Sequence, residues 1–140
     1  MIKVKTLINL LKKNSCNFFT GVPDSVLKEL SSSLQRKNKK DHIIATNEGS
    51  AVSIGIGHYL STKKLPVIYM QNSGLSNALN PLISIAHKKV YSIPLILLIG
   101  WRGSPKIKDE PQHNVKGKIT EQILKLLNIK YTILRTNTDF

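Results

Sequence analysis

A glutamate stands at the junction between an apolar run and a glycine-rich one. In HIIATNEGSAVSIGIGHYL, residues 42–60, Glu48 precedes a helix-like segment that contains Gly49, Gly55 and Gly57. Each glycine inside a helix costs roughly 1 kcal/mol relative to alanine. Small residues let another backbone or a flat ligand approach closely, which offsets that cost. Glu48 is therefore a candidate for ligand contact; the alternative is a carboxylate that only interacts with the helix macrodipole.

Similar polar segments follow each of four apolar runs. They read TGVPDS (20–25), TNEGS (46–50), QNSG (71–74) and GWRGSP (100–105). In a parallel sheet all four lie at the carboxyl ends of the strands, where open α/β sheets bind their ligands. Turns between strands and helices also need glycine and Asx residues for their geometry. Asp24 is explained equally well as a helix cap.

The elements that must position these segments alternate along the chain. Helical spacing of apolar residues marks four helices besides the glycine-rich one, and continuously apolar runs mark five strands. The expected helices are 3–14, 25–35, the glycine-rich segment, 73–89 (with Pro81 at a start or interruption) and 119–128; the expected strands are 16–22, 42–46, 66–71, 93–101 and 130–134. This order predicts an α/β protein with an open, doubly wound parallel sheet and helices on both faces. The strand 93–101 is the most apolar and is expected to be central.

Length and composition bound the class of protein. The 140 residues, 41% of them hydrophobic, suit one domain over 1–140. No apolar run is long enough to span a bilayer, and the N-terminus has no secretory cleavage pattern. Cys16 is the only cysteine, which excludes an internal disulfide and a cysteine-based zinc site. We expect a cytoplasmic protein without a membrane partner.

The net charge of +13 raises the question of nucleic-acid binding. The 21 lysines and arginines are scattered from end to end, and aromatic residues make up only 6% of the chain. No aromatic and basic residues interleave in the way that base stacking requires. A solvated basic surface, or a basic pocket for an anionic substrate or an acidic partner, is expected in place of a nucleic-acid site.

Familiar cofactor and metal motifs are missing from the sequence. GIGHYL (55–60) lacks the third glycine of a dinucleotide fingerprint and lies inside a helical pattern, and GKI (117–119) lacks the loop of a phosphate-binding motif. The four histidines show no metal-ligand spacing. His113 differs from the others because it falls in DEPQHN, on an expected long loop over 102–116. Long loops in compact domains are often functional, so His113 is a candidate active-site residue.

Five blocks of the sequence carry a family resemblance. They are FFTGVPDS, HIIATNEGSA, PVIYMQNSGLSNALNPL, YSIPLILLIGWRG and KDEPQH. Together they closely resemble the first domain of phosphonopyruvate decarboxylases and, somewhat less closely, the alpha subunit of sulfopyruvate decarboxylases. Both are thiamine-diphosphate enzymes. The similarity extends from about residue 16 to residue 134; it is specific for the type of domain and less so for the substrate.

The resemblance implies a pyrimidine-binding (PYR) domain and a role for each polar segment. Glu48 would hydrogen-bond N1′ of the aminopyrimidine ring and so favour the tautomer that removes the thiazolium C2 proton. Asp24 and His113 would transfer protons or orient the substrate. Arg102 is a candidate partner for a phosphonate or sulfonate, since guanidinium matches such oxyanions; a surface or interface arginine is the alternative. The residues expected to line the pyrimidine pocket are Gln71, Asn72, Ser73 and Gly74.

The resemblance also implies a partner. Thiamine enzymes hold Mg²⁺ and the diphosphate through a Gly-Asp-Gly or similar motif followed by Asn, and none occurs in these 140 residues. Mg²⁺ ligands are therefore expected on a pyrophosphate-binding (PP) domain, in another subunit of a homo- or hetero-oligomer or in a part lost by truncation. The expected reaction is decarboxylation of 3-phosphonopyruvate to phosphonoacetaldehyde and CO2. Alternatives are sulfopyruvate as substrate, or a non-catalytic remnant that only binds a partner.

Overall fold

A four-stranded parallel sheet forms the centre of the molecule. The computed structural model describes residues 3–36, 38, 40–105 and 107–135. The strands are β1 (Phe19–Gly21), β2 (His42–Ile44), β3 (Val67–Gln71) and β4 (Ile96–Gly100), in the order β2-β1-β3-β4. Phe19 pairs with His42 on one side and with Val67 on the other, and Val67 pairs with Ile96. Because the chain goes outward from β1 to β2 and then crosses back to β3, a topological switch point lies between β1 and β3.

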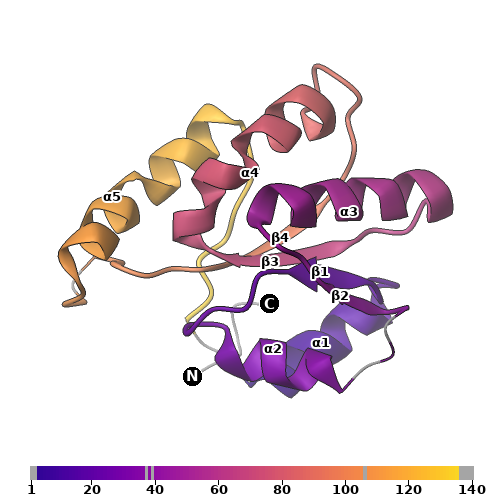
Figure 1. The fold of residues 1–140 in the computed structure, drawn as a ribbon, viewed down its shortest axis with the longest axis horizontal. Helices are drawn as coiled ribbons and strands as arrows, with labels where there is room; N and C mark the ends of the chain where they lie inside the picture. The colour runs from indigo at the N-terminus through magenta and orange to yellow at the C-terminus, as the bar shows by residue number, and fades with distance from the viewer. Residues whose placement is uncertain (1–2, 37, 39, 106, 136–140) are drawn as a thin grey trace.

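Helices cover both faces of this sheet (Figure 1). On one face lie α1 (Val4–Lys13) and α2 (Lys28–Gln35); on the other lie α3 (Glu48–Thr62), α4 (Leu75–Pro81) and α5 (Pro111–Leu126). The 3₁₀ turn η1 (Asn72–Gly74) precedes α4, and the π-helical segment η2 (Leu82–Ala86) follows it. The expected doubly wound α/β fold is confirmed. Within the part of the chain that the structure describes, no helix is long and apolar enough to cross a membrane.

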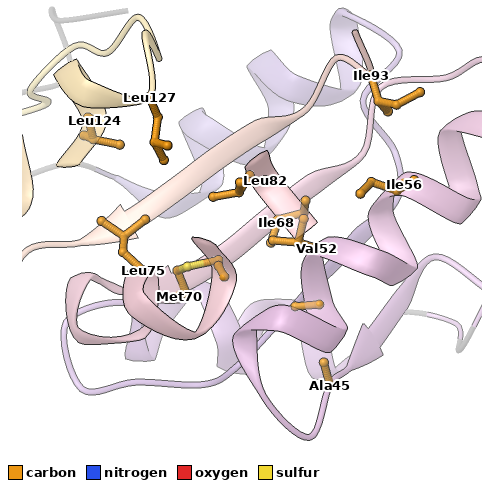
Figure 2. Packing of buried hydrophobic residues seen from close by; sticks show 12 residues of the cluster. Ala45, Val52, Ile56, Ile68, Met70, Leu75, Leu82, Ile93, Leu124 and Leu127 are labelled. Atoms are coloured by element: carbon orange, nitrogen blue, oxygen red, sulfur yellow. The ribbon is translucent and has the colours of Figure 1, made fainter. Parts of the chain in front are cut away.

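Alternation along β3 divides the core into two layers. Ile68 and Met70 are fully buried on the side of α3, α4 and α5, as Figure 2 shows. Val67 and Tyr69 are fully buried on the side of α1 and α2. Successive side chains of a strand point to opposite faces, so a strand buried on both faces is apolar along its whole length. This explains the unbroken apolar runs of the sequence.

Two glycines are required by close packing on β3. A Cβ on Gly21 would lie 2.6 Å from Cγ of Tyr69, whose ring extends across β1 and whose hydroxyl is 2.9 Å from Nε2 of His42. A Cβ on Gly55 of α3 would lie 2.8 Å from Cδ1 of Ile68. Gly21 therefore leaves room for the Tyr69 ring within the sheet, and Gly55 lets α3 approach the sheet closely.

The C-terminal third differs from the prediction in three respects. The loop expected over 102–116 ends early, because α5 begins with Pro111 as its first residue, a position that suits proline. His113 is therefore on a helix. Residues 130–134 form no strand in the described structure. The strand 93–101 is at the sheet edge as β4, and its apolar residues are explained by helices packing on both of its faces.

The segment 73–89, expected as one helix, is divided around Pro81. The chain passes from 3₁₀ to α to π geometry between Asn72 and Ala86. Proline removes a backbone donor and its ring clashes with the preceding turn, so an interrupted helix is the expected result. As a result, η1 and α4, which directly follow β3, form a short element of their own.

Candidate functional site

The parallel sheet brings all four polar segments to one edge, which we call the rim. Each segment begins where its strand ends: at Gly21 for β1, Ile44 for β2, Gln71 for β3 and Gly100 for β4. The strands are parallel and in register, so the four connections leave on the same side. The rim includes the switch point between β1 and β3, where ligands of open α/β sheets bind.

Glu48 is the first residue of α3 and faces the start of α4. Asn47 caps the helix, because its side-chain oxygen accepts a hydrogen bond of 2.8 Å from the backbone N–H of Ser50. Oε2 of Glu48 accepts one of 2.9 Å from Nδ2 of Asn77, and the side chain stays partly exposed. A Cβ on Gly74 would overlap the carboxyl group of Glu48. Gly74 thus leaves room for this carboxylate.

Gly49 fixes the approach of the two helices behind Glu48. A Cβ at Gly49 would lie 2.8 Å from the backbone oxygen of Asn77. Any side chain there would push α3 away from α4 and disturb the hydrogen bond between Asn77 and Glu48. The small residue next to Glu48 therefore has a definite packing role, as the sequence suggested.

In the segment at the end of β3, Gln71 and Ser73 are partly exposed on the rim, whereas Asn72 is buried and makes hydrogen bonds within the chain. Ser73 donates from Oγ to Oε1 of Gln71 at 2.8 Å, and both residues are half-buried on the rim. Asn72 is buried and joins β3 to the chain that follows β4. Its Nδ2 donates to the carbonyl of Arg102 and to Oγ1 of Thr120, and its Oδ1 accepts from the N–H of Arg102. The amide of Asn72 is therefore occupied in holding the rim together.

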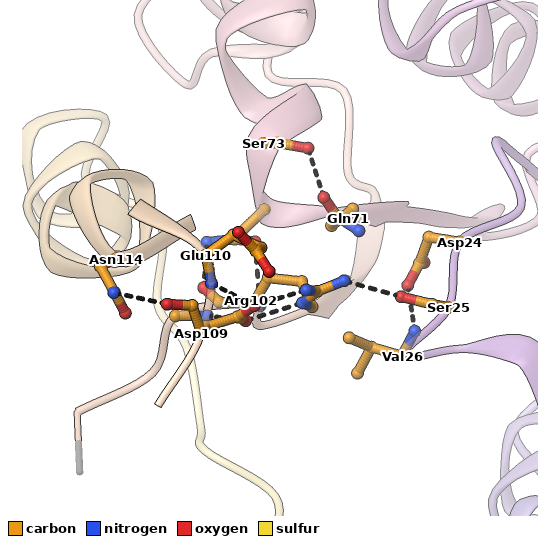
Figure 3. A network of polar contacts seen from close by, with 11 residues as sticks. Asp24, Ser25, Val26, Gln71, Ser73, Arg102, Asp109, Glu110 and Asn114 are labelled. Atoms are coloured by element: carbon orange, nitrogen blue, oxygen red, sulfur yellow. Dashed lines mark hydrogen bonds and ion pairs between the residues drawn. The ribbon is translucent and has the colours of Figure 1, made fainter. Parts of the chain in front are cut away.

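Arg102 is bound to a carboxylate on its own connection. Its Nε donates to Oδ2 of Asp109 at 2.7 Å, its Nη2 donates to Oδ1 of Asp109, and its Nη1 donates to Oγ of Ser25 at 3.1 Å, as Figure 3 shows. The Asp109 carboxylate also accepts the backbone N–H groups of Gly103 and Glu110, each at 2.9 Å. The hydrogen bond from Arg102 holds the pKa of Asp109 well below its usual range, and the same bond raises the pKa of Arg102.

Asp24 has one engaged and one unused carboxylate oxygen. Oδ1 accepts hydrogen bonds from the backbone N–H groups of Val26 at 2.7 Å and Leu27 at 3.1 Å, which makes it a cap for the turn that leads into α2. Oδ2 is buried and has no hydrogen-bond partner within the described residues. A buried acceptor without a partner costs free energy, on the order of 1–3 kcal/mol. Such an atom at the rim is available to a bound group.

His113 presents a second buried polar atom without a partner. It lies in the first turn of α5, and its Nδ1 accepts or donates no hydrogen bond in the described structure. The connection after β4 passes closely over this turn at Gly103, where φ is 64° and a Cβ would overlap the carbonyl of His113. No hydrogen bond joins His113 to Asp24 in the part that the structure describes. The two residues share the rim and do not form a pair.

Sequence reasoning missed the partners of the predicted residues. Asp109 lies in the quoted KDEPQH block, but only the folded connection shows that it binds Arg102. Asn77 lies three residues after Gly74, which is one helical turn, and that spacing could have identified it as a neighbour of Glu48. Among the described residues, no three His, Cys, Asp or Glu side chains gather as a metal site. The expectation that a partner supplies the Mg²⁺ ligands stays a prediction.

Comparison with protein families identifies the type of domain. Residues 3–124 match the family described as thiamine pyrophosphate enzyme, N-terminal TPP binding domain. A phosphonopyruvate decarboxylase from Streptomyces viridochromogenes is 36% identical over 119 residues, which are 85% of this chain and 29% of that protein. The alpha subunit of a sulfopyruvate decarboxylase from Methanocaldococcus jannaschii is 33% identical over 123 residues, which are 88% of this chain and 70% of that subunit.

Comparison with solved structures agrees with the fold. The benzoylformate decarboxylase of Polynucleobacter necessarius superposes with a TM-score of 0.60 at 25% identity, over 76% of this chain and 19% of that one. The chain thus spans less than a third of the Streptomyces relative and of this structural neighbour. The similarity concerns one domain of these larger proteins.

Proposed function

Because the chain belongs to the family of N-terminal TPP-binding domains of thiamine pyrophosphate enzymes, we propose that it is the pyrimidine-binding half of a thiamine-diphosphate-dependent 2-oxo acid decarboxylase. The relatives named above are decarboxylases of phosphonopyruvate, sulfopyruvate and benzoylformate, which supports this class of reaction. The observation that carries the proposal is the Glu48 carboxylate, which lies at the rim against Gly74 and receives one side-chain hydrogen bond, from Asn77.

The residues around Glu48 fit an aminopyrimidine ring. A carboxylate accepts hydrogen bonds from ring N–H groups, and the absence of a side chain at Gly74 lets the Glu48 carboxyl group keep its place at the rim. Glu48 would hold a proton shared with a ring nitrogen, and Asn77 would fix the carboxylate for that contact. Gln71 and Ser73, which are joined by a hydrogen bond, would border the ring. When bound, thiamine diphosphate supplies the carbon nucleophile and the electron sink that decarboxylation needs.

The unused atoms at the rim support roles for two more residues. Oδ2 of Asp24 and Nδ1 of His113 are buried without partners in the described chain, and each is able to take or give a proton. We assign them proton transfer to the substrate or its orientation. That Arg102 binds the anionic group of the substrate stays a prediction. Its guanidinium already contacts Asp109 and would have to bind both carboxylate and substrate.

The substrate is proposed to be a three-carbon 2-oxo acid with a second anionic group. Phosphonopyruvate and sulfopyruvate both meet this description, and the relatives support them equally. The diphosphate and its Mg²⁺ are proposed to bind a PP domain of a partner subunit or of another part of the same protein. A side-by-side assay of the complex on both acids distinguishes the two substrates.

Glu48→Gln tests the proposal. The amide keeps the size of the carboxylate and loses its charge, so the reconstituted complex is expected to lose about 100- to 10,000-fold in kcat, the usual contribution of positioned proton transfer. Steady-state kinetics on phosphonopyruvate and sulfopyruvate give the measurement, and calorimetric titration with thiamine diphosphate and Mg²⁺ reports cofactor binding. Near-normal turnover of this variant would rule out the mechanism. Unchanged circular dichroism spectra serve as the folding control.

A further inference from the structure

Negative charge surrounds Arg102. Asp109 holds the guanidinium through two hydrogen bonds, and the charges of Asp109, Glu110 and Asp24 all raise the pKa of Arg102. Three carboxylates therefore act on one guanidinium. A second anionic group of a substrate would meet repulsion at this position, because like charges at close range destabilise one another. The rim needs another cation if it is to bind such a group.

Lys116 of α5 is a cation on the same rim with few partners. Its half-buried side chain donates a hydrogen bond from Nζ to the backbone oxygen of Ser73, over a long 3.3 Å. In the described part of the chain no carboxylate lies within 4.0 Å of this ammonium. An ammonium group has three donors and a full charge. Its bond to a neutral carbonyl leaves both the charge and further donors available.

The surroundings of Lys116 suit a small oxyanion. Lys116 lines a small, mostly apolar cleft of about 40 Å³ between the segment after β3 and α5, together with Ser73, Ser76, Ile119 and Ile123. Apolar walls reduce screening by water and so strengthen a charge interaction. Lysine is a common point-charge binder of phosphate groups.

The position of Lys116 relates it to the other site residues. It lies three residues after His113 on α5, so the two side chains share one face of the helix. Its hydrogen-bond partner Ser73 directly precedes Gly74, against which the Glu48 carboxylate lies. A substrate held at Lys116 would therefore lie next to Ser73 and Gly74, close to Glu48, and on the face of α5 that carries His113.

We propose that Lys116, and not Arg102, binds the terminal phosphonate or sulfonate of the substrate. The inference rests on the proposed function, since it names the group that recognises the substrate of that reaction. Either oxyanion would replace the weak contact with Ser73 by a charge-assisted hydrogen bond, which is roughly twice as strong as a neutral one.

The test compares Lys116→Met with Lys118→Met in the complex with its PP partner. Lys118 lies on the same helix and is exposed. The substitution Lys118→Met therefore removes the same charge from the chain without altering the cleft. For Lys116→Met we expect kcat/KM to fall about 10- to 100-fold on phosphonopyruvate and sulfopyruvate and to change little on pyruvate, which lacks the second anion. Lys118→Met is expected to match the wild type on all three acids.

A binding measurement separates this inference from the proposed reaction. Calorimetric titration of the complex with 3-phosphonopropionate, 3-sulfopropionate and propionate needs no turnover. The Kd of the first two ligands should rise about 10- to 100-fold in Lys116→Met, and Lys116→Arg should restore part of the affinity. Equal Kd values in the wild type and Lys116→Met, or no binding by the wild type, would overturn the role of Lys116. Binding without turnover of any 2-oxo acid would instead contradict the proposed function alone.

Discussion

Two parts of the same rim use charged side chains in opposite ways. In the Glu48 cluster (Glu48, Gly74 and Asn77) the carboxylate receives one side-chain hydrogen bond and stays partly exposed. In the Arg102 cluster (Ser25, Arg102 and Asp109) the Asp109 carboxylate receives four N–H groups and is only 10% exposed. A charged side chain whose hydrogen bonds are all made within the chain stabilises the fold. A charged side chain with unused hydrogen-bonding capacity at a ligand-binding edge is available to a ligand.

Gly74→Ala should produce the largest effect on the Glu48 cluster. A methyl group there overlaps the Glu48 carboxyl group, so the side chain must turn away toward solvent. Because Glu48 is partly exposed, this movement should cost little stability, while the complex loses at least about 100-fold in kcat/KM and binds thiamine diphosphate more weakly. Kinetics, cofactor titration and thermal melts of the same preparation measure the three quantities. A melting temperature that falls together with activity would show that Gly74 serves packing and not the site.

Asp109→Asn in the Arg102 cluster should lower stability much more than activity, the reverse of Gly74→Ala. The amide cannot accept all four N–H groups and leaves the Arg102 charge without its counter-ion, so the melting temperature should drop by several degrees. The effect on kcat/KM should be much smaller than that of Gly74→Ala. Thermal melts and steady-state kinetics of both variants, made side by side, give the comparison. A severe loss of activity at unchanged stability would place Asp109 in the site itself.

The contribution of Asp109 to stability should depend on pH in a definite direction. The pKa of Asp109 is lowered from its ordinary value of 3.8, chiefly by the hydrogen bond from Arg102. The folded state therefore binds its proton less readily than the unfolded chain does, so Asp109 stabilises the fold above pH 3.8 and this contribution is lost as the pH falls toward the lowered pKa. The melting temperatures of the wild type and Asp109→Asn should differ at neutral pH and converge in acid. A constant difference down to the lowest pH at which both fold would contradict the ion pair's role.

The difference between the clusters also shows what the sequence was able to predict. Glu48 could be placed, because an apolar run, a capping residue and a glycine-rich helix are local patterns with definite geometry. The pairing of Arg102 with Asp109 could not, because it depends on how the intervening connection folds back. The same limit applies to His113: Pro111 in fact starts a helix there, and the sequence allows proline in a loop or in a first helical turn.

Strand positions show a related limit. The run 93–101 is apolar because helices pack on both faces of β4, and this pattern does not distinguish an edge strand from a central one. The run 130–134 has a strand-like composition, yet strand formation needs a partner edge as well as propensity. Local composition therefore predicts which segments are apolar and extended more reliably than it predicts their neighbours.

Gly57→Ala gives the smallest effect and extends the comparison into α3. The three glycines of this helix differ in what a Cβ would meet: the backbone of Asn77 at Gly49, the side chain of Ile68 at Gly55, and nothing within 4 Å at Gly57. Alanine at Gly57 should therefore stabilise the chain by about 0.5–1 kcal/mol through helix propensity alone, while Gly55→Ala should destabilise it. Urea unfolding of both variants measures the difference. If Gly57→Ala gains the expected stability but fails to form an active complex, another part of that complex packs against this face of α3, and the glycine serves assembly in the way that Gly74 serves the carboxylate.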